Sequence, residues 1–223
     1  MKISYATHKL FNIERGKINV IATDNPIVYR DFILGCRDQS DLVKAYDDEF
    51  NAVEVTGAID WLGDLMITQN LDKKYLPAIF KKMFADMPDE QRGRIHLATQ
   101  NLDNAIQEGL YLADFPIKVT YDFDLRKSLK FAHTHFDDDI LKQPYDIIKT
   151  VLKIHQICEM KSCLTICNVA HYITIEQMED LAAFLQDVML PLALIEFTDN
   201  KANEFYKNCN FYYIDKDYVD WYE

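Results

Sequence analysis

The segment Ser162–Phe197 limits the possible folds more than any other part of the chain, because it contains a complete strand–helix–strand unit. Leu164–Val169 is a nearly continuous apolar run, which is typical of a strand covered on both faces. Leu192–Phe197 is a second run of the same kind. Two parallel strands joined by a helix bury both faces of their sheet, so this unit predicts the nucleus of an α/β layer.

The helix between these two strands has clear start and stop signals. Thr174 stands at the N-cap position and Gln177 at the capping-box position three residues later. Leu181 and Leu185 follow at helical spacing, and Pro191 ends the pattern.

The N-terminal part of the chain repeats the change from strand to helix. Lys17–Thr23 predicts a strand, and Asp24 or Asn25 as the N-cap before Pro26 predicts the start of a helix. Further short strands are expected at Lys2–Ala6, Leu42–Tyr46, Ala52–Thr56, Phe211–Ile214 and Tyr218–Trp221, while Ala58–Met66 is ambiguous between strand and helix. We therefore predict an α/β head domain made of residues 1–70 and 161–223.

Between these parts, residues 71–160 show mainly helical periodicity. Leu76, Phe80 and Met83 belong to one apolar stripe, and Ile148 and Leu152 belong to another. This pattern predicts a mostly helical subdomain inserted into the head.

Composition and charge restrict the class of protein. With 223 residues, 49% of them hydrophobic, the chain can form one large domain or a domain with an insertion. The net charge of −12 argues against a surface that binds nucleic acid everywhere, although it allows a local basic face. The five cysteines lie mostly in apolar runs, which fits reduced thiols. The sequence has no signal-like segment, and no run approaches the roughly 20 apolar residues of a membrane span. We therefore expect a cytoplasmic protein without membrane contact.

A phosphate-binding loop is not found in the sequence. Gly16-Lys17 has neither the upstream glycine nor the following Ser or Thr of a Walker motif, and it precedes a strand instead of following one. The turns at 23–25 and 168–172 are not rich in glycine either. ATP hydrolysis is therefore not expected.

The pattern His133-x-His135-x-Asp137 resembles the opening of a binuclear metallohydrolase motif. Two imidazoles and a carboxylate could bind zinc and lower the pKa of a bound water molecule. Asp138 stands where that motif has a further histidine, and no downstream His-bearing loop completes it. The alternative interpretation is the polar end of a helix that spans Leu125–Ala132.

Acidic and basic residues form two further candidate sets. The aspartates Asp122, Asp124, Asp137, Asp138 and Asp139 could bind calcium, although they lack EF-hand spacing, or they could be solvated loop residues. Among the basic residues, Lys74, Lys81 and Lys82 could share one helix surface, and Lys142, Lys149 and Lys153 could share another. Either surface could contact phosphates without reading bases, or it could be a solvated helix face.

Four segments together resemble the Csn family, the accessory proteins of type II-A CRISPR systems that take part in spacer acquisition. They are ERGKINVIATDNPIVYRDFI, TYDFDLRKSLK, CLTICNVAHYITIEQMEDLAAF and NFYYIDKDYV, and the resemblance extends over essentially the whole chain. None of the four is a catalytic motif, and the resemblance depends on their order and spacing.

The resemblance implies a head domain similar to a degenerate P-loop NTPase core, an inserted helical leg, and a homotetrameric ring that double-stranded DNA ends enter. It also implies no catalysis, a supporting role for calcium, and partnership with the CRISPR adaptation integrase and the type II effector nuclease. Carried over to this sequence, the calcium ligands would be Asp122 and Asp124, with Asp137 and Asp138 as additional ligands. The DNA-binding residues would be Lys73, Lys74, Lys81, Lys82, Lys149 and Lys153.

We therefore expect a non-catalytic, sequence-independent binder of double-stranded DNA ends. The alternative from another class is a metal-dependent hydrolase that uses His133, His135 and Asp137. A third hypothesis is a structural adaptor that contacts only proteins.

Overall fold

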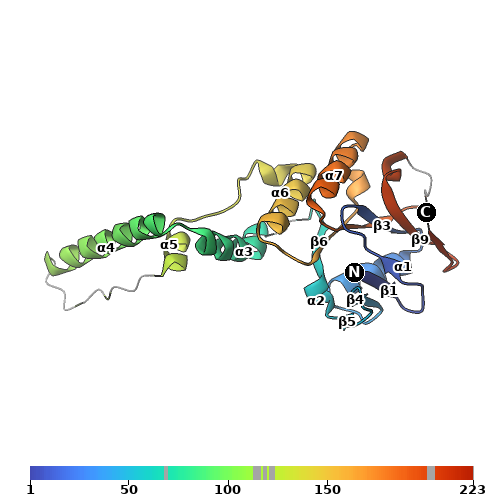
Figure 1. Cartoon of the computed structure of the whole chain (residues 1–223), viewed down its shortest axis with the longest axis horizontal. Coiled ribbons are helices and arrows are strands. Elements are labelled where there is room, and N and C mark those ends of the chain that lie inside the picture. The colour runs from blue at the N-terminus through green and yellow to red at the C-terminus, as the bar shows by residue number, and fades with distance from the viewer. Residues whose placement is uncertain (68–69, 113–116, 118–119, 121–123, 200–203, 223) are drawn as a thin grey trace. The chain divides into compact units, whose positions relative to one another are not determined.

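The computed structural model describes residues 1–67, 70–112, 117, 120, 124–199 and 204–222 (Figure 1). The chain forms two compact units. Met1–Gln69 and Asp138–Glu223 together make the first, here called the α/β unit, and Asn70–Asp137 makes the second, the helical unit.

A six-stranded mixed sheet is the centre of the α/β unit. Its order is β10-β9-β3-β8-β7-β6, in which only β10 pairs antiparallel with its neighbour. The strands are β3 (Ile18–Thr23), β6 (Ile59–Asp64), β7 (Cys163–Cys167), β8 (Leu192–Phe197), β9 (Cys209–Ile214) and β10 (Asp220–Tyr222). Every residue of β3 and β7 is buried, as expected for strands covered on both faces.

A second, antiparallel sheet is separated from the first by helix α1 (Pro26–Cys36). Its order is β2-β1-β4-β5, with β1 at Lys2–Tyr5, β2 at Phe11–Asn12, β4 at Val43–Tyr46 and β5 at Ala52–Val53. Helix α1 contacts β3 and β8 of the large sheet and also β4 of the small one. A Cβ atom on Gly35 would lie only 2.4 Å from the Cβ atom of Val43, so the close approach of α1 to β4 requires glycine at this position.

Helices α6 (Pro144–Ile157) and α7 (Ile175–Val188) lie side by side in the α/β unit (Figure 1). Helix α6 buries Ile148, Val151 and Leu152 completely. Its buried His155 ring is 2.7 Å from the carboxylate of Asp60 on β6, which attaches α6 to the edge strand of the sheet. Four short elements complete this unit: α2 (Val55–Ala58) and the 3-10 turns η1 (Ile140–Lys142), η2 (Val169–His171) and η3 (Glu204–Tyr206).

The helical unit contains α3 (Leu71–Asp86), α4 (Asp89–Leu112) and α5 (Leu125–Phe131). Leu71 and Tyr75 on α3 are buried, whereas α4 has no buried residue along its 24 positions. None of the described helices has the length and apolar content needed to cross a membrane.

The strand–helix–strand unit that was predicted at Ser162–Phe197 is confirmed as β7, α7 and β8, with β7 and β8 parallel. The strands expected at Leu42–Tyr46 and Ala52–Thr56 form the antiparallel pair β4 and β5, although β5 ends at Val53. The ambiguous segment Ala58–Met66 contains strand β6. The division into units differs from the predicted boundaries of 71–160 for the helical part, because residues 138–160 belong to the α/β unit. The reason is that the apolar stripe of α6 is buried within the α/β unit.

The capping box of α7 gives a test of local stability. The Thr174 hydroxyl accepts from the backbone N–H of Gln177 at 3.3 Å, and the Gln177 side chain accepts from the backbone N–H of Thr174 at 2.9 Å. We expect Thr174→Ala to lower the free energy of unfolding by about 1 kcal/mol, because one helix N–H loses its partner. Urea titration measures this as a lower midpoint with the same slope. Glu179→Gln on the exposed side of α7 is the control, and an equal loss there would contradict the capping argument.

Candidate functional site

The six lysines predicted to bind DNA lie on two helices that belong to different units. Lys73, Lys74, Lys81 and Lys82 are on α3 in the helical unit, whereas Lys149 and Lys153 are on α6 in the α/β unit. The prediction that all six belong to the helical part is therefore wrong for the two lysines of α6.

Lys149 is already engaged within the α/β unit. Its ammonium group lies 2.8 Å from the carboxylate of Asp180 on α7, which also accepts from the Tyr145 hydroxyl. The hydrogen bond to Asp180 raises the pKa of Lys149, and the Lys149 ammonium lowers the pKa of Asp180. This charge is compensated inside the protein, while Lys153 on the same helix is exposed.

The lysines of α3 also differ in their partners. Lys82 lies 3.3 Å from Asp86, one turn further along the helix. Lys73 and Lys81 are exposed and have no hydrogen bond or ion pair through their ammonium groups with any residue that the structure describes. These two positive charges are thus available to an external anion.

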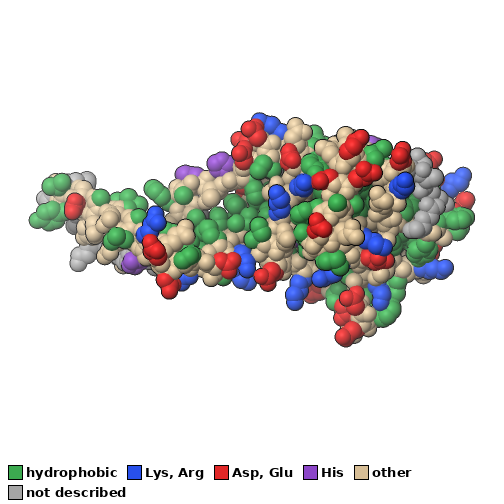
Figure 2. Space-filling model, turned by 45° about the horizontal axis from the view of Figure 1, so that its top comes forward, with side chains coloured by type: hydrophobic (Ala, Val, Ile, Leu, Met, Phe, Trp, Pro, Cys, Tyr) green, Lys and Arg blue, Asp and Glu red, His purple; other side chains and the backbone are tan. Residues whose placement is uncertain are grey.

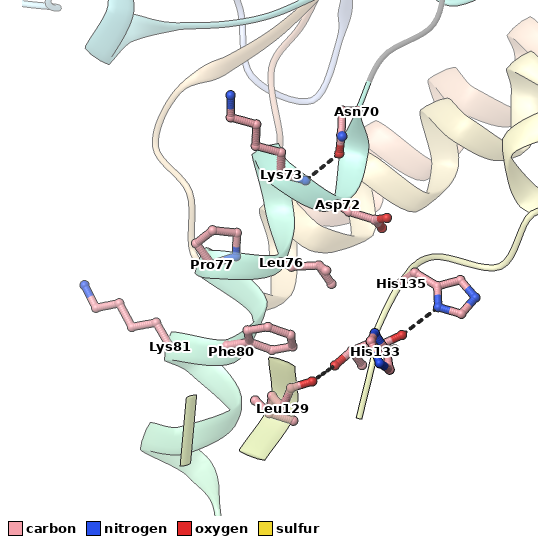
Figure 3. A pocket seen from close by; sticks show the side chains of 11 residues that line it. Asn70, Asp72, Lys73, Leu76, Pro77, Phe80, Lys81, Leu129, His133 and His135 are labelled. Carbon is pink, nitrogen blue, oxygen red and sulfur yellow. Dashed lines mark hydrogen bonds between the residues drawn. The ribbon is translucent and has the colours of Figure 1, made fainter. Parts of the chain in front are cut away.

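Lys73 and Lys81 line a groove of about 910 Å³ in the helical unit, here called the α3 groove (Figure 3). It lies between α3 and the segment that runs from the end of α5 to residue 135. Its lining residues are Asn70, Asp72, Lys73, Leu76, Pro77, Phe80, Lys81, Leu129, His133, Thr134 and His135.

Two adjacent rows of α3 side chains form one wall of the α3 groove. In Figure 3, Leu76 and Phe80 point toward Leu129 and His133. The neighbouring row is Lys73, Pro77 and Lys81, in which the two ammonium groups extend away from the imidazoles. The spacing of four residues keeps each row on one helix face, so apolar and cationic surfaces lie next to each other.

Hydrogen bonds hold the opposite wall in place. The Phe136 N–H donates to Asp72 at 2.8 Å, and the Thr134 hydroxyl donates to the Leu129 carbonyl oxygen at 2.8 Å. The Nδ1 atom of His135 donates to the His133 carbonyl oxygen at 2.8 Å. His133 itself has a left-handed backbone with φ of 49°. Both imidazoles therefore belong to an ordered turn beside the groove.

The metal-site predictions receive no support from this geometry. Among the described residues, no group of three or more His, Cys, Asp or Glu side chains is arranged to hold a metal ion. His133, His135 and Asp137 are therefore not gathered into a zinc site. Of the predicted calcium ligands, Asp122 lies outside the described residues, and Asp124, Asp137 and Asp138 do not form a ligand set.

The carboxyl edge of the large sheet is the other place where α/β proteins bind ligands. Here the edge is occupied by the protein's own polar groups. The Asn168 side chain donates to Asp64 at 2.9 Å and accepts from the Tyr29 hydroxyl at 2.8 Å. Glu196 on β8 accepts from the backbone N–H groups of Val169 at 2.8 Å and Ala170 at 3.4 Å.

Glu196 was not singled out by sequence reasoning, although it is the one charged residue in the apolar strand β8. It is 2% exposed, and burial raises its pKa to about 7 despite the two N–H donors. Its carboxylate accepts hydrogen bonds from the backbone N–H groups that a bound phosphate would need as donors, and Asp64 adds negative charge nearby. The edge is therefore unsuited to a nucleotide.

Glu196 predicts a defined dependence of stability on pH. Its pKa in the folded chain is raised above the usual 4.5, so the folded state holds a proton that the unfolded state releases between about pH 4.5 and 7. The contribution of the protonated Glu196 carboxyl to the free energy of unfolding is therefore fully present below pH 4.5 and is lost as the pH rises through 7. We expect Glu196→Gln to be more stable than the wild type at pH 8 by about 3 kcal/mol and nearly equal to it at low pH. Urea titrations across this range measure the difference, and a variant less stable at pH 8 would show that the hydrogen bonds to the carboxylate outweigh its desolvation.

Comparison with known proteins shows the fold alone. No protein-family model matches the chain, and no curated protein matches it. Among solved structures, the chain is similar to the crystal structure of Stu0660 of Streptococcus thermophilus, with a TM-score of 0.54 and 11% sequence identity, over 96% of this chain and 74% of that chain. The chain therefore has an α/β fold with a mixed sheet that is shared with a bacterial protein of very different sequence.

Proposed function

We propose that this chain binds the ends of double-stranded DNA without sequence preference and without catalysis. The observation that carries the proposal is the pair Lys73 and Lys81 on one row of α3, whose charges have no carboxylate partner among the described residues. Eight residues of helix separate them by about 12 Å along the axis, so they would contact different phosphates of one duplex. Contacts of this kind fix a backbone and carry no base information.

The state of the thiols supports a non-catalytic role. Burial raises the pKa of Cys36 and of Cys163 to about 12 and that of Cys167 to about 11, so none of them is a ready nucleophile. The buried pair of His155 and Asp60 lies away from solvent and is better explained as a link between α6 and β6.

The charge distribution favours a local basic surface in an assembly. The net charge is −12, and on the face shown in Figure 2 the Lys and Arg side chains are interspersed with Asp and Glu. A single chain of this kind would repel DNA over most of its surface. A homotetrameric ring whose lumen is lined by the exposed lysines would solve this problem, because it concentrates the positive charges where the duplex passes.

The resemblance to the Csn family supplies the remaining parts of the proposal. They are a head related to a degenerate P-loop core, a helical leg inserted into it, a role in CRISPR spacer acquisition in the cytoplasm, and partnership with the adaptation integrase and the type II effector nuclease. The similarity to Stu0660 supports the fold and does not extend to these partners. Calcium binding would require Asp122 or ligands from elsewhere, because the described aspartates do not form a set.

The role of the two free lysines can be measured through the salt dependence of binding. We expect the double variant Lys73→Gln, Lys81→Gln to weaken binding to any duplex, because two phosphate contacts are lost. The slope of log affinity against log salt should fall in magnitude by about 1.8, or about 0.9 for each contact. Fluorescence anisotropy at several salt concentrations measures this slope.

Lys82→Gln and Lys149→Gln are matched controls, because both residues are already paired with aspartates. They should leave the slope nearly unchanged. If the controls lower the slope as much as the double variant does, or if the double variant has no effect, the assignment of the phosphate contacts to α3 is wrong.

The requirement for DNA ends is tested by comparing linear duplex with the same DNA as a closed circle. A ring that threads over ends should shift the linear form in a gel and leave the circle unbound. Light scattering with and without calcium gives the mass of the assembly in the same buffers and shows whether calcium is needed for a tetramer. Equal binding of both DNA forms would exclude threading, and a monomer that binds DNA would exclude the ring.

A further inference from the structure

We infer that the α3 groove accepts an unpaired nucleotide at a DNA end, a frayed or overhanging base together with its phosphate. This inference rests on the proposed binding of DNA ends and adds to it a site for the terminal residue. It predicts that the protein distinguishes ends by whether a base is free to leave the duplex.

The apolar wall of the groove is suited to the face of a base. Phe80 is half-buried, so part of its ring remains accessible, and Figure 3 shows it pointing across the groove toward Leu129 and His133. The ring of Phe84, one turn further along α3, stacks with it, with centroids 6.4 Å apart and planes 27° apart, which limits the orientations that Phe80 can take. Aromatic side chains that present a fixed face bind unstacked bases of any sequence.

The charges beside this wall are suited to successive phosphates of the strand whose end enters the groove. Lys81 follows Phe80 directly in sequence, and Lys73 lies two turns earlier on the same row. At the opposite wall the Thr134 hydroxyl donates to the Leu129 carbonyl oxygen and Nδ1 of His135 donates to the His133 carbonyl oxygen, so the phosphate contacts are left to the lysines. Asp72, the one carboxylate among the described residues that line the groove, accepts from the Phe136 N–H and so is partly compensated.

The size of the groove and its mixed chemistry favour a nucleotide over other occupants. A volume of about 910 Å³ is in the range of small-ligand sites and exceeds what a single base needs. A second copy of the chain that docked through apolar contacts alone would leave the ammonium groups of Lys73 and Lys81 facing an apolar surface, which is costly. Inside an intact duplex the base faces are stacked and inaccessible to Phe80, and a paired terminal base cannot leave its partner to enter the groove.

The experiment compares a blunt duplex with the same duplex carrying one unpaired adenine at each 3′ end, and separately at each 5′ end. We expect at least one overhang to bind about tenfold more tightly than the blunt end, a gain typical of one base on an aromatic ring. Phe80→Leu should abolish that gain, so that overhanging and blunt ends bind to the variant equally. The adenine analogue 2-aminopurine at the overhang should change its fluorescence on binding to the wild type and not on binding to Phe80→Leu.

Phe84→Leu is the matched control, because Phe84 contacts the Phe80 ring but does not line the groove. It should retain most of the overhang gain. If blunt and overhanging ends bind equally to the wild type, or if Phe80→Leu retains the gain, the inference is overturned while the proposed function stands. If no duplex binds, both fail. If free deoxyadenosine monophosphate competes as strongly as the overhanging duplex, the groove binds free nucleotides. If Phe80→Leu lowers the mass of the assembly, the groove is a contact between copies of the chain. Either result overturns the inference.

Discussion

Strand β3 is the constraint on which the rest of the α/β unit depends. All six of its residues are buried, and it pairs in parallel with β8 on one side and β9 on the other. Its buried Asn19 side chain donates to the carbonyl oxygens of Glu14, Lys17 and Leu192 and accepts from the Glu14 N–H and the Asn210 side chain. Because a buried amide must have all its partners, a shift in strand register would leave these polar groups unsatisfied. The positions of the carboxyl ends of β3 and β8 follow from this register.

That register places acidic groups where many α/β proteins hold an anion. Glu196 pairs with Ala22 across β3 and β8, and just beyond it the Thr198 N–H donates to the Thr23 carbonyl oxygen at 3.0 Å. The Glu196 carboxylate in turn accepts from the first amides of η2. An internal carboxylate thus takes the place of an external phosphate, at the cost of a raised pKa. The sheet has parallel strands like those of ligand-binding α/β proteins, but the polar groups at its carboxyl edge are hydrogen-bonded to other groups of the same chain.

Much of this fold could be predicted from the sequence where the signals are local. Thr174 with Gln177, and Asn25 with Pro26, identify helix starts because side chains a few residues apart satisfy the helix N–H groups. The unit to which a helix belongs is not a local property, which explains the boundary error at α6. Its apolar stripe resembles those of α3 and α4, and only burial against neighbouring elements distinguishes them.

The α3 groove could not be predicted from the sequence either. Its lysines and histidines lie far apart along the chain, and only the fold brings Lys73, Lys81, His133 and His135 to one cavity.

The two units therefore differ in what they leave available to a partner. In the α/β unit, Lys149 is compensated by Asp180 and Glu196 by backbone amides, so these charges are satisfied internally. In the helical unit, α4 buries no residue, and Leu97, Leu102 and Ile106 are exposed along it. Most helical stability in proteins comes from the packing of an apolar face, so a helix with no buried face contributes little to the stability of an isolated chain. A partner that bound this unit would add the contacts that it lacks, and binding to the folded form alone would stabilise it in proportion to the affinity. Binding of a partner to the helical unit would therefore add proportionally more to its stability than binding to the well-packed α/β unit would.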